Sequence, residues 1–171
     1  MTKYKVITAV PTTSADKLPS VYLGELHYFI QERRNYGYNR EININHTRHL
    51  LQQSLKDCDA DLVLLMDSDV VVTKNDLEIL LDSFDGKNPI CIDTKPKFWD
   101  REHHVCCACC LMRFEDWQKI DYIDTFVDEC QCSKIRELYP QVSYCNGIKG
   151  YELKKKNSVQ IVDKLFNEVA E

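Results

Sequence analysis

The chain has 171 residues, of which 44% are hydrophobic and 29% are charged, and this is the composition of one globular domain with a substantial core. Its formal net charge of −5 argues against a dedicated nucleic-acid binder, which normally carries a basic excess on one face. No apolar run approaches the ~20 residues of a membrane-spanning helix, and the start of the chain lacks the hydrophobic region of a signal peptide, so we expect a cytoplasmic protein with a single domain over residues 1–171.

Strands and helices are expected to alternate in the first third of the chain. Residues 4–10 alternate in polarity and are rich in β-branched side chains, which predicts a strand, and Pro11, Thr12 and Thr13 predict the loop after it. Apolar residues in the range 22–33 recur at helical spacing, so a helix is expected there. Residues 41–45 predict a short strand, and residues 46–49 predict the start of a helix.

Two carboxylates follow the most apolar short run of the chain. Residues 62–66 are uniformly apolar, which favours a central parallel strand that is buried on both faces. Asp67 and Asp69 come directly after it, and in extended backbone their side chains would point to the same side. Open α/β sheets bind ligands at the carboxyl ends of their strands, and paired carboxylates suit Mg²⁺ or Mn²⁺. The alternative is a solvated Asp-Ser-Asp turn with no ligand.

The elements after this strand are again predicted from spacing. Apolar residues at helical spacing predict a helix over residues 74–84 that ends at Asp85-Gly86, and residues 89–92 predict a short strand. Residues 105–112 predict a buried strand, and the segment with Cys132, Ile135 and Leu138 predicts a helix that buries these three side chains. An amphipathic helix is expected over about 157–170. The pattern as a whole predicts an α/β fold with three layers and a mostly parallel central sheet.

Nine cysteines are many for an intracellular chain, and four of them fall within residues 106–110. Neighbouring residues of a strand face opposite sides of a sheet, so these thiols are interpreted as core residues, although a zinc or iron–sulfur site is the alternative. The cysteines are either reduced or, in a hyperthermophile, engaged in disulfides. Because nine is an odd number, at least one thiol stays free within a monomer.

Four segments in this order resemble the nucleotide-sugar-dependent glycosyltransferases of the GT-A fold, most closely the family 2 type. Residues 6–13 are similar to the first strand and the Pro-Thr loop beside the nucleotide, and residues 46–50 are similar to the helix start that carries an arginine, here Arg48. Asp67-Ser68-Asp69 resembles the Asp-x-Asp signature that binds metal and diphosphate. Residues 128–136 resemble the acidic motif and the helix that follows it.

The resemblance implies a metal-dependent hexosyltransferase that moves a sugar from a nucleoside-diphosphate sugar to an acceptor, which could be a glycan, a protein or a lipid. By this resemblance, Asp67 and Asp69 would bind Mn²⁺ or Mg²⁺, and Asp128 would be the general base of an inverting reaction. A further set of residues would bind the donor. The donor-binding residues that the resemblance implies are Pro11, Thr12, Thr13, Arg48, Asp67 and Ser68. The small size and high cysteine content suit a reduced member of the family from a virus or a hyperthermophilic archaeon, which would place a viral protein in the host cytoplasm.

A different enzyme class gives the alternative. An apolar strand followed by Asp67-Ser68-Asp69 also resembles the haloacid-dehalogenase-like phosphatases, in which Asp67 would be the nucleophile and Asp69 the acid/base. That motif normally lies on the first strand of its domain, whereas a strand and two helices are expected to precede it here. A binding module without catalysis is the non-enzymatic alternative, and the sequence leaves homo-oligomerisation open.

Overall fold

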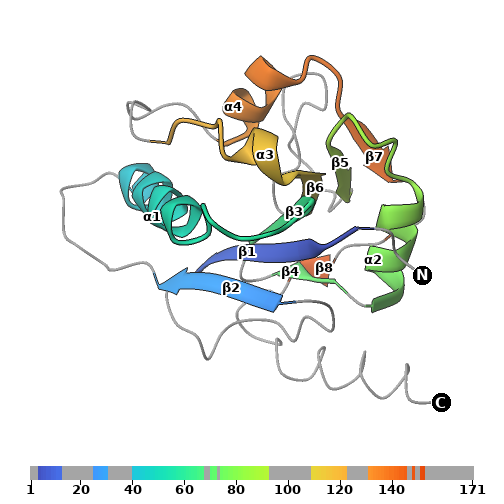
Figure 1. The fold of residues 1–171 in the computed structure, drawn as a ribbon, viewed down its shortest axis with the longest axis horizontal. Coiled ribbons are helices and arrows are strands. Elements are labelled where there is room, and N and C mark those ends of the chain that lie inside the picture. The colour runs from blue at the N-terminus through green and yellow to red at the C-terminus, as the bar shows by residue number, and fades with distance from the viewer. Residues whose placement is uncertain are drawn as a thin grey trace.

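The fold is built on one six-stranded mixed sheet (Figure 1). The computed structural model describes residues 4–12, 25–30, 40–67, 70–72, 74–92, 109–122, 131–145, 148 and 151–152. The strands of the sheet, in spatial order, are β2 (Glu25–Ile30), β1 (Val6–Thr12), β3 (Leu62–Met66), β6 (Cys109–Arg113), β5 (Ile90–Ile92) and β7 (Ser143–Cys145). The helices are α1 (Arg40–Ser54), α2 (Lys74–Asp82), α3 (Phe114–Trp117) and α4 (Gln131–Leu138).

One strand runs against the others. β1 pairs in parallel with β2 and with β3, and β5 pairs in parallel with β7, while β6 is antiparallel to both of its neighbours. A second small sheet joins β4 (Val70–Val71) to β8 (Tyr151–Glu152) in antiparallel fashion. The prediction of an α/β fold is confirmed, and the central sheet is mixed because the chain returns through β6.

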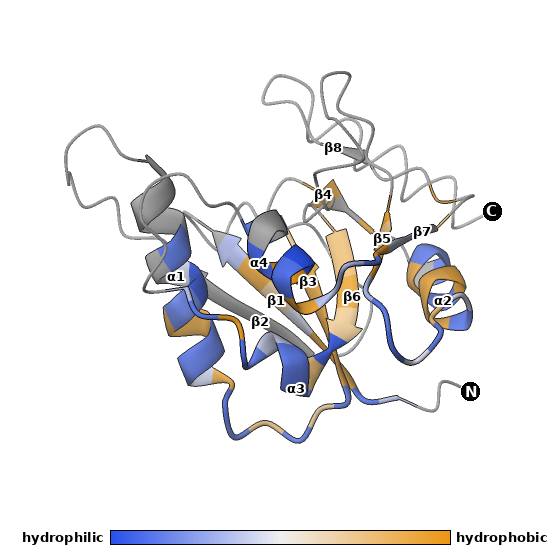
Figure 2. Cartoon of the chain, turned by 90° about the horizontal axis from the view of Figure 1, so that it is seen from above, coloured by the Kyte–Doolittle hydropathy of each residue, from blue (hydrophilic) through white to orange (hydrophobic). Residues whose placement is uncertain are grey.

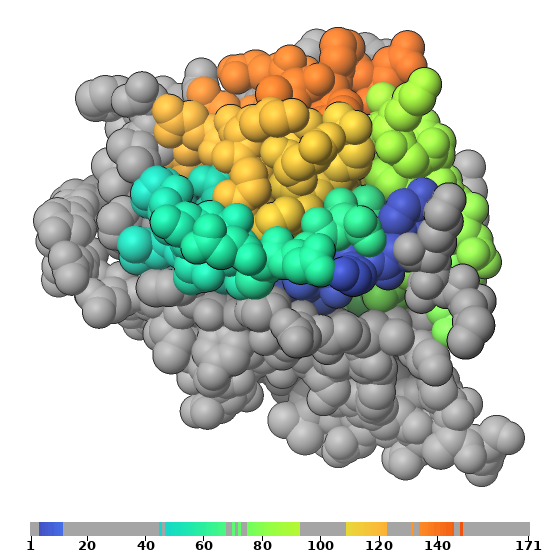
Figure 3. Space-filling model, in the orientation of Figure 1, coloured from blue at the N-terminus to red at the C-terminus, as the bar shows by residue number. Residues whose placement is uncertain are grey.

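The central strand β3 is buried on both faces and separates two cores. All five of its residues are buried, and each is expected to contribute roughly 1.5–3 kcal/mol through burial. Val63 and Leu65 face the core that helices α1, α3 and α4 cover, whereas Leu62, Leu64 and Met66 face the core that α2 and β4 cover. Figure 2 shows the apolar colour along β3 and β6, and in Figure 3 the yellow region that contains α3 lies between the teal α1 and the orange region that contains α4.

Helix α2 and its ending follow the sequence pattern. Leu77, Leu80, Leu81 and Phe84 are all buried in the second core, as their helical spacing predicts. Asp85 accepts hydrogen bonds from the backbone N–H groups of residues 87 and 88, at 2.8 and 2.7 Å, which closes the turn after the helix. Gly86 within that turn has a φ of 82°, a conformation that glycine adopts without steric cost.

Three expectations about the N-terminal third are wrong. Residues 25–30 form the strand β2 and not a helix, because Leu26, Tyr28 and Ile30 also alternate and the segment pairs along β1. Residues 41–45 belong to helix α1, which begins at Arg40, and not to a strand. Pro11 and Thr12 are part of β1 and not of a loop. In each case tertiary pairing or packing outweighed the local sequence pattern, which alone did not distinguish the spacing of a strand from that of a helix or a loop.

The cysteine-rich strand is confirmed in the part that the structure describes. Cys110 lies in the core under α1, α3 and α4, whereas Cys109 lies in the core under α2, as neighbours in a strand must. The α4 prediction was wrong for one side chain, because Leu138 is 41% exposed while Ile135 is fully buried. The predicted C-terminal helix lies outside the described residues. None of the helices that the structure describes is long and apolar enough to cross a membrane.

Candidate functional site

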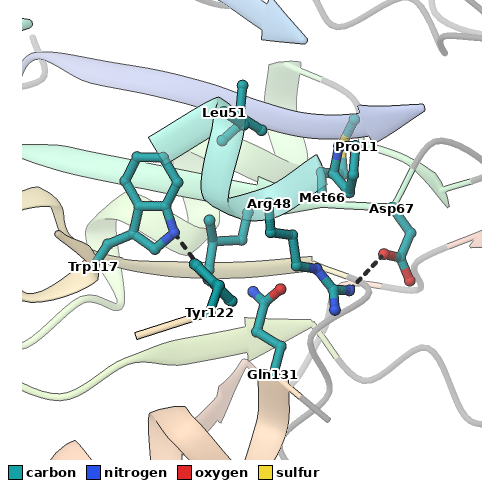
Figure 4. Close-up of a pocket in the computed structure, with 10 residues that line it drawn as sticks. Pro11, Arg48, Leu51, Met66, Asp67, Trp117, Tyr122 and Gln131 are labelled. Carbon is teal, nitrogen blue, oxygen red and sulfur yellow. Dashed lines mark hydrogen bonds and ion pairs between the residues drawn. The ribbon is translucent and has the colours of Figure 1, made fainter. Parts of the chain in front are cut away.

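A pocket opens at the carboxyl ends of β1 and β3 (Figure 4). β1 has β2 on one side and β3 on the other, so the chain changes direction across the sheet at β1. Open α/β sheets form their ligand crevice at such a switch point, outside the carboxyl ends of the two strands. The ten lining residues are Ala9, Pro11, Arg48, Leu51, Leu65, Met66, Asp67, Trp117, Tyr122 and Gln131.

These residues come from five separate parts of the chain. Pro11 lies near the end of β1 and Asp67 follows the last residue of β3, so both reach the same edge of the sheet. Helix α1 packs on β1 and β2 and presents Arg48, while α4 begins at Gln131. The cavity volume is about 10 Å³, far below the roughly 300–1,000 Å³ of typical small-molecule sites. A ligand the size of a nucleotide sugar would therefore extend beyond these ten residues.

The charged side of the pocket is formed by Arg48 and Asp67. Nη2 of Arg48 lies 3.9 Å from Oδ1 of Asp67, which is longer than a hydrogen bond. The Arg48 side chain is only 13% exposed, its Nη1 donates to Oδ1 of Asn45 at 3.4 Å, and its buried Nε has no hydrogen-bond partner. A largely buried guanidinium whose Nε has no partner fits an anionic ligand, because carboxylate and phosphate oxygens match its fork of N–H groups.

The opposite wall is formed by two buried aromatic side chains. Trp117 and Tyr122 are both buried, and Nε1 of Trp117 donates to the Tyr122 hydroxyl at 3.1 Å. Nε2 of Gln52 donates to the backbone carbonyls of Trp117, at 2.7 Å, and of Ile120, at 2.9 Å. Gln52 lies on α1, so this buried amide fixes the segment that carries Trp117 and Tyr122 against the helix that carries Arg48.

Three of the predicted donor-binding residues meet in this pocket. Pro11, Arg48 and Asp67 line it together, although they are far apart in the sequence. Thr12 is in β1, but its side chain is outside what the structure describes. The remaining predicted site residues lie outside the described residues, and they are Thr13, Ser68, Asp69 and Asp128.

A metal site is supported by one of its predicted ligands only. Asp67 offers a carboxylate that is 41% exposed at the pocket, and oxygen of this kind suits Mg²⁺ or Mn²⁺. Within the described ranges no group of three or more His, Cys, Asp or Glu side chains could hold a metal ion. Asp69, the second predicted ligand, directly precedes β4, and chain connectivity keeps its Cα within roughly 7 Å of that of Asp67.

Sequence reasoning missed two polar members of the pocket. Tyr122 was not singled out, and Gln131 was interpreted only as part of the motif around residues 128–136. The available signal for Gln131 was its spacing from Ile135, because residues four apart lie on the same face of a helix. Gln131 is 5% exposed and Ile135 is fully buried, so both lie on the inner face of α4.

The arginine near the end of β6 lies at the opposite edge of the sheet. Arg113 pairs in register with Leu62, the first residue of β3, whereas the pocket lies beyond the last. Its Nε donates to Oδ2 of Asp116 at 2.6 Å, and Asp116 also accepts from Lys119 at 2.7 Å and from the Tyr139 hydroxyl. Burial raises the pKa of the Asp116 carboxyl, but its three hydrogen-bond donors together lower that pKa by more. The pKa of Asp116 is therefore below its usual value. Burial and the bond to Asp116 raise the pKa of Tyr139 to about 12.

Comparisons with known proteins support the fold and nothing finer. No protein-family model matches the chain, and no curated protein matches it by sequence. Among solved structures, the crystal structure of A197 from STIV, a viral protein, resembles it with a TM-score of 0.54 and 14% sequence identity. The likeness covers 88% of this chain and 86% of A197. At this identity the similarity shows a shared α/β fold.

Proposed function

We propose that the protein is a metal-dependent glycosyltransferase with a GT-A-like fold that transfers a sugar from a nucleoside-diphosphate sugar to an acceptor. The observation that carries the proposal is the meeting of Pro11, Arg48 and Asp67 in one pocket at the switch point of the sheet. The sequence resemblance assigned these three residues to donor binding from three separate segments. A solvated Asp-Ser-Asp turn would not require a largely buried arginine with an unpaired Nε near Asp67.

The described residues suit the diphosphate part of such a donor. Arg48 has a buried Nε without a partner and could form charge-assisted hydrogen bonds to phosphate oxygens. Asp67 and Asp69 are the residues that would hold the cation. A bound divalent cation would supply Lewis-acid stabilisation of the negative charge that grows on the leaving diphosphate. Arg48 would stabilise the same charge from the protein side, in a partly dry site where such contacts are stronger.

The general base is proposed to be Asp128, by the resemblance. Asp128 precedes Gln131 by three residues, so chain connectivity keeps the two Cα atoms within roughly 11 Å. Gln131 itself lines the pocket with Arg48 and Asp67. A carboxylate in this neighbourhood could accept the proton of the acceptor hydroxyl as that oxygen attacks the sugar, and attack opposite the diphosphate would invert the anomeric centre.

A screen against nucleotide sugars tests the proposal. The protein is incubated with uridine and guanosine diphosphate sugars and Mn²⁺ or Mg²⁺, and both thermal stabilisation and slow hydrolysis of the donor are measured. At least one donor should stabilise the fold in a metal-dependent way. The alternative of a haloacid-dehalogenase-like phosphatase predicts instead the release of phosphate from a generic aryl phosphate. Two strands and one helix precede the motif's own strand β3 in the part of the chain that the structure describes, which does not favour that alternative.

A further inference from the structure

Gln131 is a buried glutamine whose carboxamide makes no hydrogen bond within the part of the chain that the structure describes, yet its oxygen and nitrogen are not among the fully buried atoms that lack a partner. It is the first residue of α4 and is 5% exposed. Ile135, one turn later, is fully buried in the core beneath α1, α3 and α4. Gln131 therefore occupies a position where a helix of this kind would gain stability from an apolar side chain.

Gln52 shows what a structural glutamine does in this fold. It is as buried as Gln131, at 3% exposed, but its Nε2 donates to two backbone carbonyls. Buried polar groups in native structures are nearly always bonded, and the Gln52 amide follows this rule, whereas Gln131 lines the pocket without such a bond among the described residues. The contrast between the two glutamines indicates that the Gln131 amide is kept for something other than folding.

The direction of the side chain indicates what that is. Gln131 lines the pocket with Arg48, Asp67 and Tyr122, and Figure 4 shows its amide pointing into the pocket, on the same side as the Arg48 guanidinium and Tyr122. Arg48 offers only donors, and the ionised Asp67 offers only acceptors. Gln131 is neutral and offers both a donor and an acceptor, which matches a hydroxyl group better than a phosphate.

We infer that Gln131 is a specificity-determining residue that binds a hydroxyl of the donor's sugar, next to the diphosphate contacts of Arg48. The inference rests on the proposed function and adds the group that recognises the sugar. The aromatic side chains of Trp117 and Tyr122 line the same pocket, and aromatic rings of this kind can pack against the carbon face of a sugar. Phosphate and sugar would thus be recognised by different residues of one site.

The test separates sugar contacts from phosphate contacts. Dissociation constants are measured by calorimetry with Mn²⁺ for two pairs of probes, UDP with UDP-glucose and GDP with GDP-mannose. The substitution Gln131→Met keeps the length of the side chain and removes both polar groups. For the pair that the wild type binds, the dissociation constant of the sugar nucleotide should rise roughly 3- to 10-fold, while that of the diphosphate stays within about twofold.

Thermal unfolding of two matched variants supplies a readout that a structural role would change. Gln131→Met should leave Tm unchanged or raise it, because the Gln131 amide has no hydrogen bond to lose among the described residues. Gln52→Met should lower Tm, because it leaves two buried carbonyls without their donor. A fall in Tm for Gln131→Met as large as that for Gln52→Met would overturn the inference and make Gln131 structural.

The remaining outcomes are distinct. If both constants rise by the same factor, the amide contacts the nucleotide and not the sugar, and the assignment is wrong. If neither constant changes, Gln131 does not bind the donor at all. If the wild type binds none of the four probes with Mn²⁺, the proposed function fails and takes the assignment of Gln131 with it. Only the last result contradicts the proposed glycosyltransferase function. The other results contradict the assignment of Gln131 alone, so the two failures can be told apart.

Discussion

Arg48 and Asp67 face each other at the pocket with 3.9 Å between Nη2 and Oδ1, a separation that brings the charges together without a short hydrogen bond. The arginine is almost buried, at 13% exposed, and the carboxylate is 41% exposed. Each partner could therefore turn to a ligand of opposite charge, the carboxylate to a cation and the guanidinium to a phosphate, while the other still balances part of its charge. The first two predictions separate these roles.

Asp67→Asn should abolish the thermal stabilisation that Mn²⁺ and a nucleoside diphosphate give together, because an amide is a poor ligand for the cation. With ligand at 100 times its dissociation constant, the wild type should gain about 2.7 kcal/mol. Asp61→Asn is the control, since Asp61 lies just before the other end of β3 and accepts the Lys5 backbone N–H. Equal stabilisation of wild type and Asp67→Asn would rule out Asp67 as a ligand. Asp69→Asn should behave as Asp67→Asn does.

Arg48→Met should weaken binding of a nucleoside diphosphate by roughly 10- to 100-fold, the range expected for lost hydrogen bonds to a charged group. Calorimetry at low ionic strength measures the loss. Arg136→Met is the matched control, because Nε of Arg136 is also buried without a partner but its Nη1 donates to the Pro140 carbonyl after α4. If the two substitutions cost the same affinity, Arg48 does not contact the phosphates.

Asp128→Asn should leave binding of donor and Mn²⁺ almost unchanged and lower transfer to the acceptor by about 10²- to 10⁴-fold, the usual contribution of acid–base catalysis. Glu129→Gln is the neighbouring control and should remain active. An inactive Glu129→Gln with an active Asp128→Asn would assign the base to Glu129. Equal, mild losses in both would place the base elsewhere in the chain.

Asp116→Asn should lower the free energy of unfolding by roughly 1–3 kcal/mol at neutral pH, because three donors lose a charged acceptor. The pKa of Asp116 is lowered in the folded state, so its stabilisation is present above the unfolded value of about 3.9 and is lost as the pH falls through the folded value. Urea titrations between about pH 7 and pH 2 should show wild type and variant converging. Glu115→Gln, on a carboxylate that is 66% exposed, should change little at any pH.

The wild type should lose stability at alkaline pH as Tyr139 ionises, and Tyr139→Phe should lack this part of the loss. The pKa of Tyr139 is raised to about 12 in the folded state, above the ordinary value of 10.0. Its contribution is therefore complete below about pH 10 and is lost as the pH rises through about 12. Unfolding in urea from pH 9 upward should be less steeply pH-dependent in the variant than in the wild type. An identical slope would contradict the role of the Tyr139 hydroxyl.

Sequence patterns predicted those elements whose local and tertiary preferences agree. The apolar run of residues 62–66 fitted only a buried strand, which is β3. Asp67, which follows it, lies at the predicted edge of the sheet. β2 was missed because its apolar residues fit two periods, and only pairing with β1 decides between them. Gln131 was missed because its burial depends on how α4 packs, which no local pattern reveals. The pocket was predictable at Pro11, Arg48 and Asp67 and not at Tyr122 and Gln131.

The small β4–β8 sheet ties the segment after Asp69 to the last part of the chain. Val70 pairs with Glu152 and Val71 with Tyr151, so the backbone beside the two aspartates is held by residues from the other half of the sequence. During synthesis the amino-terminal part of a chain emerges first and begins to fold first. The ribosome would therefore release β1, α1 and β3 well before the strand that anchors β4. A nascent chain could hold the scaffold of the pocket early and pair β4 only after residues 151–152 have also been translated.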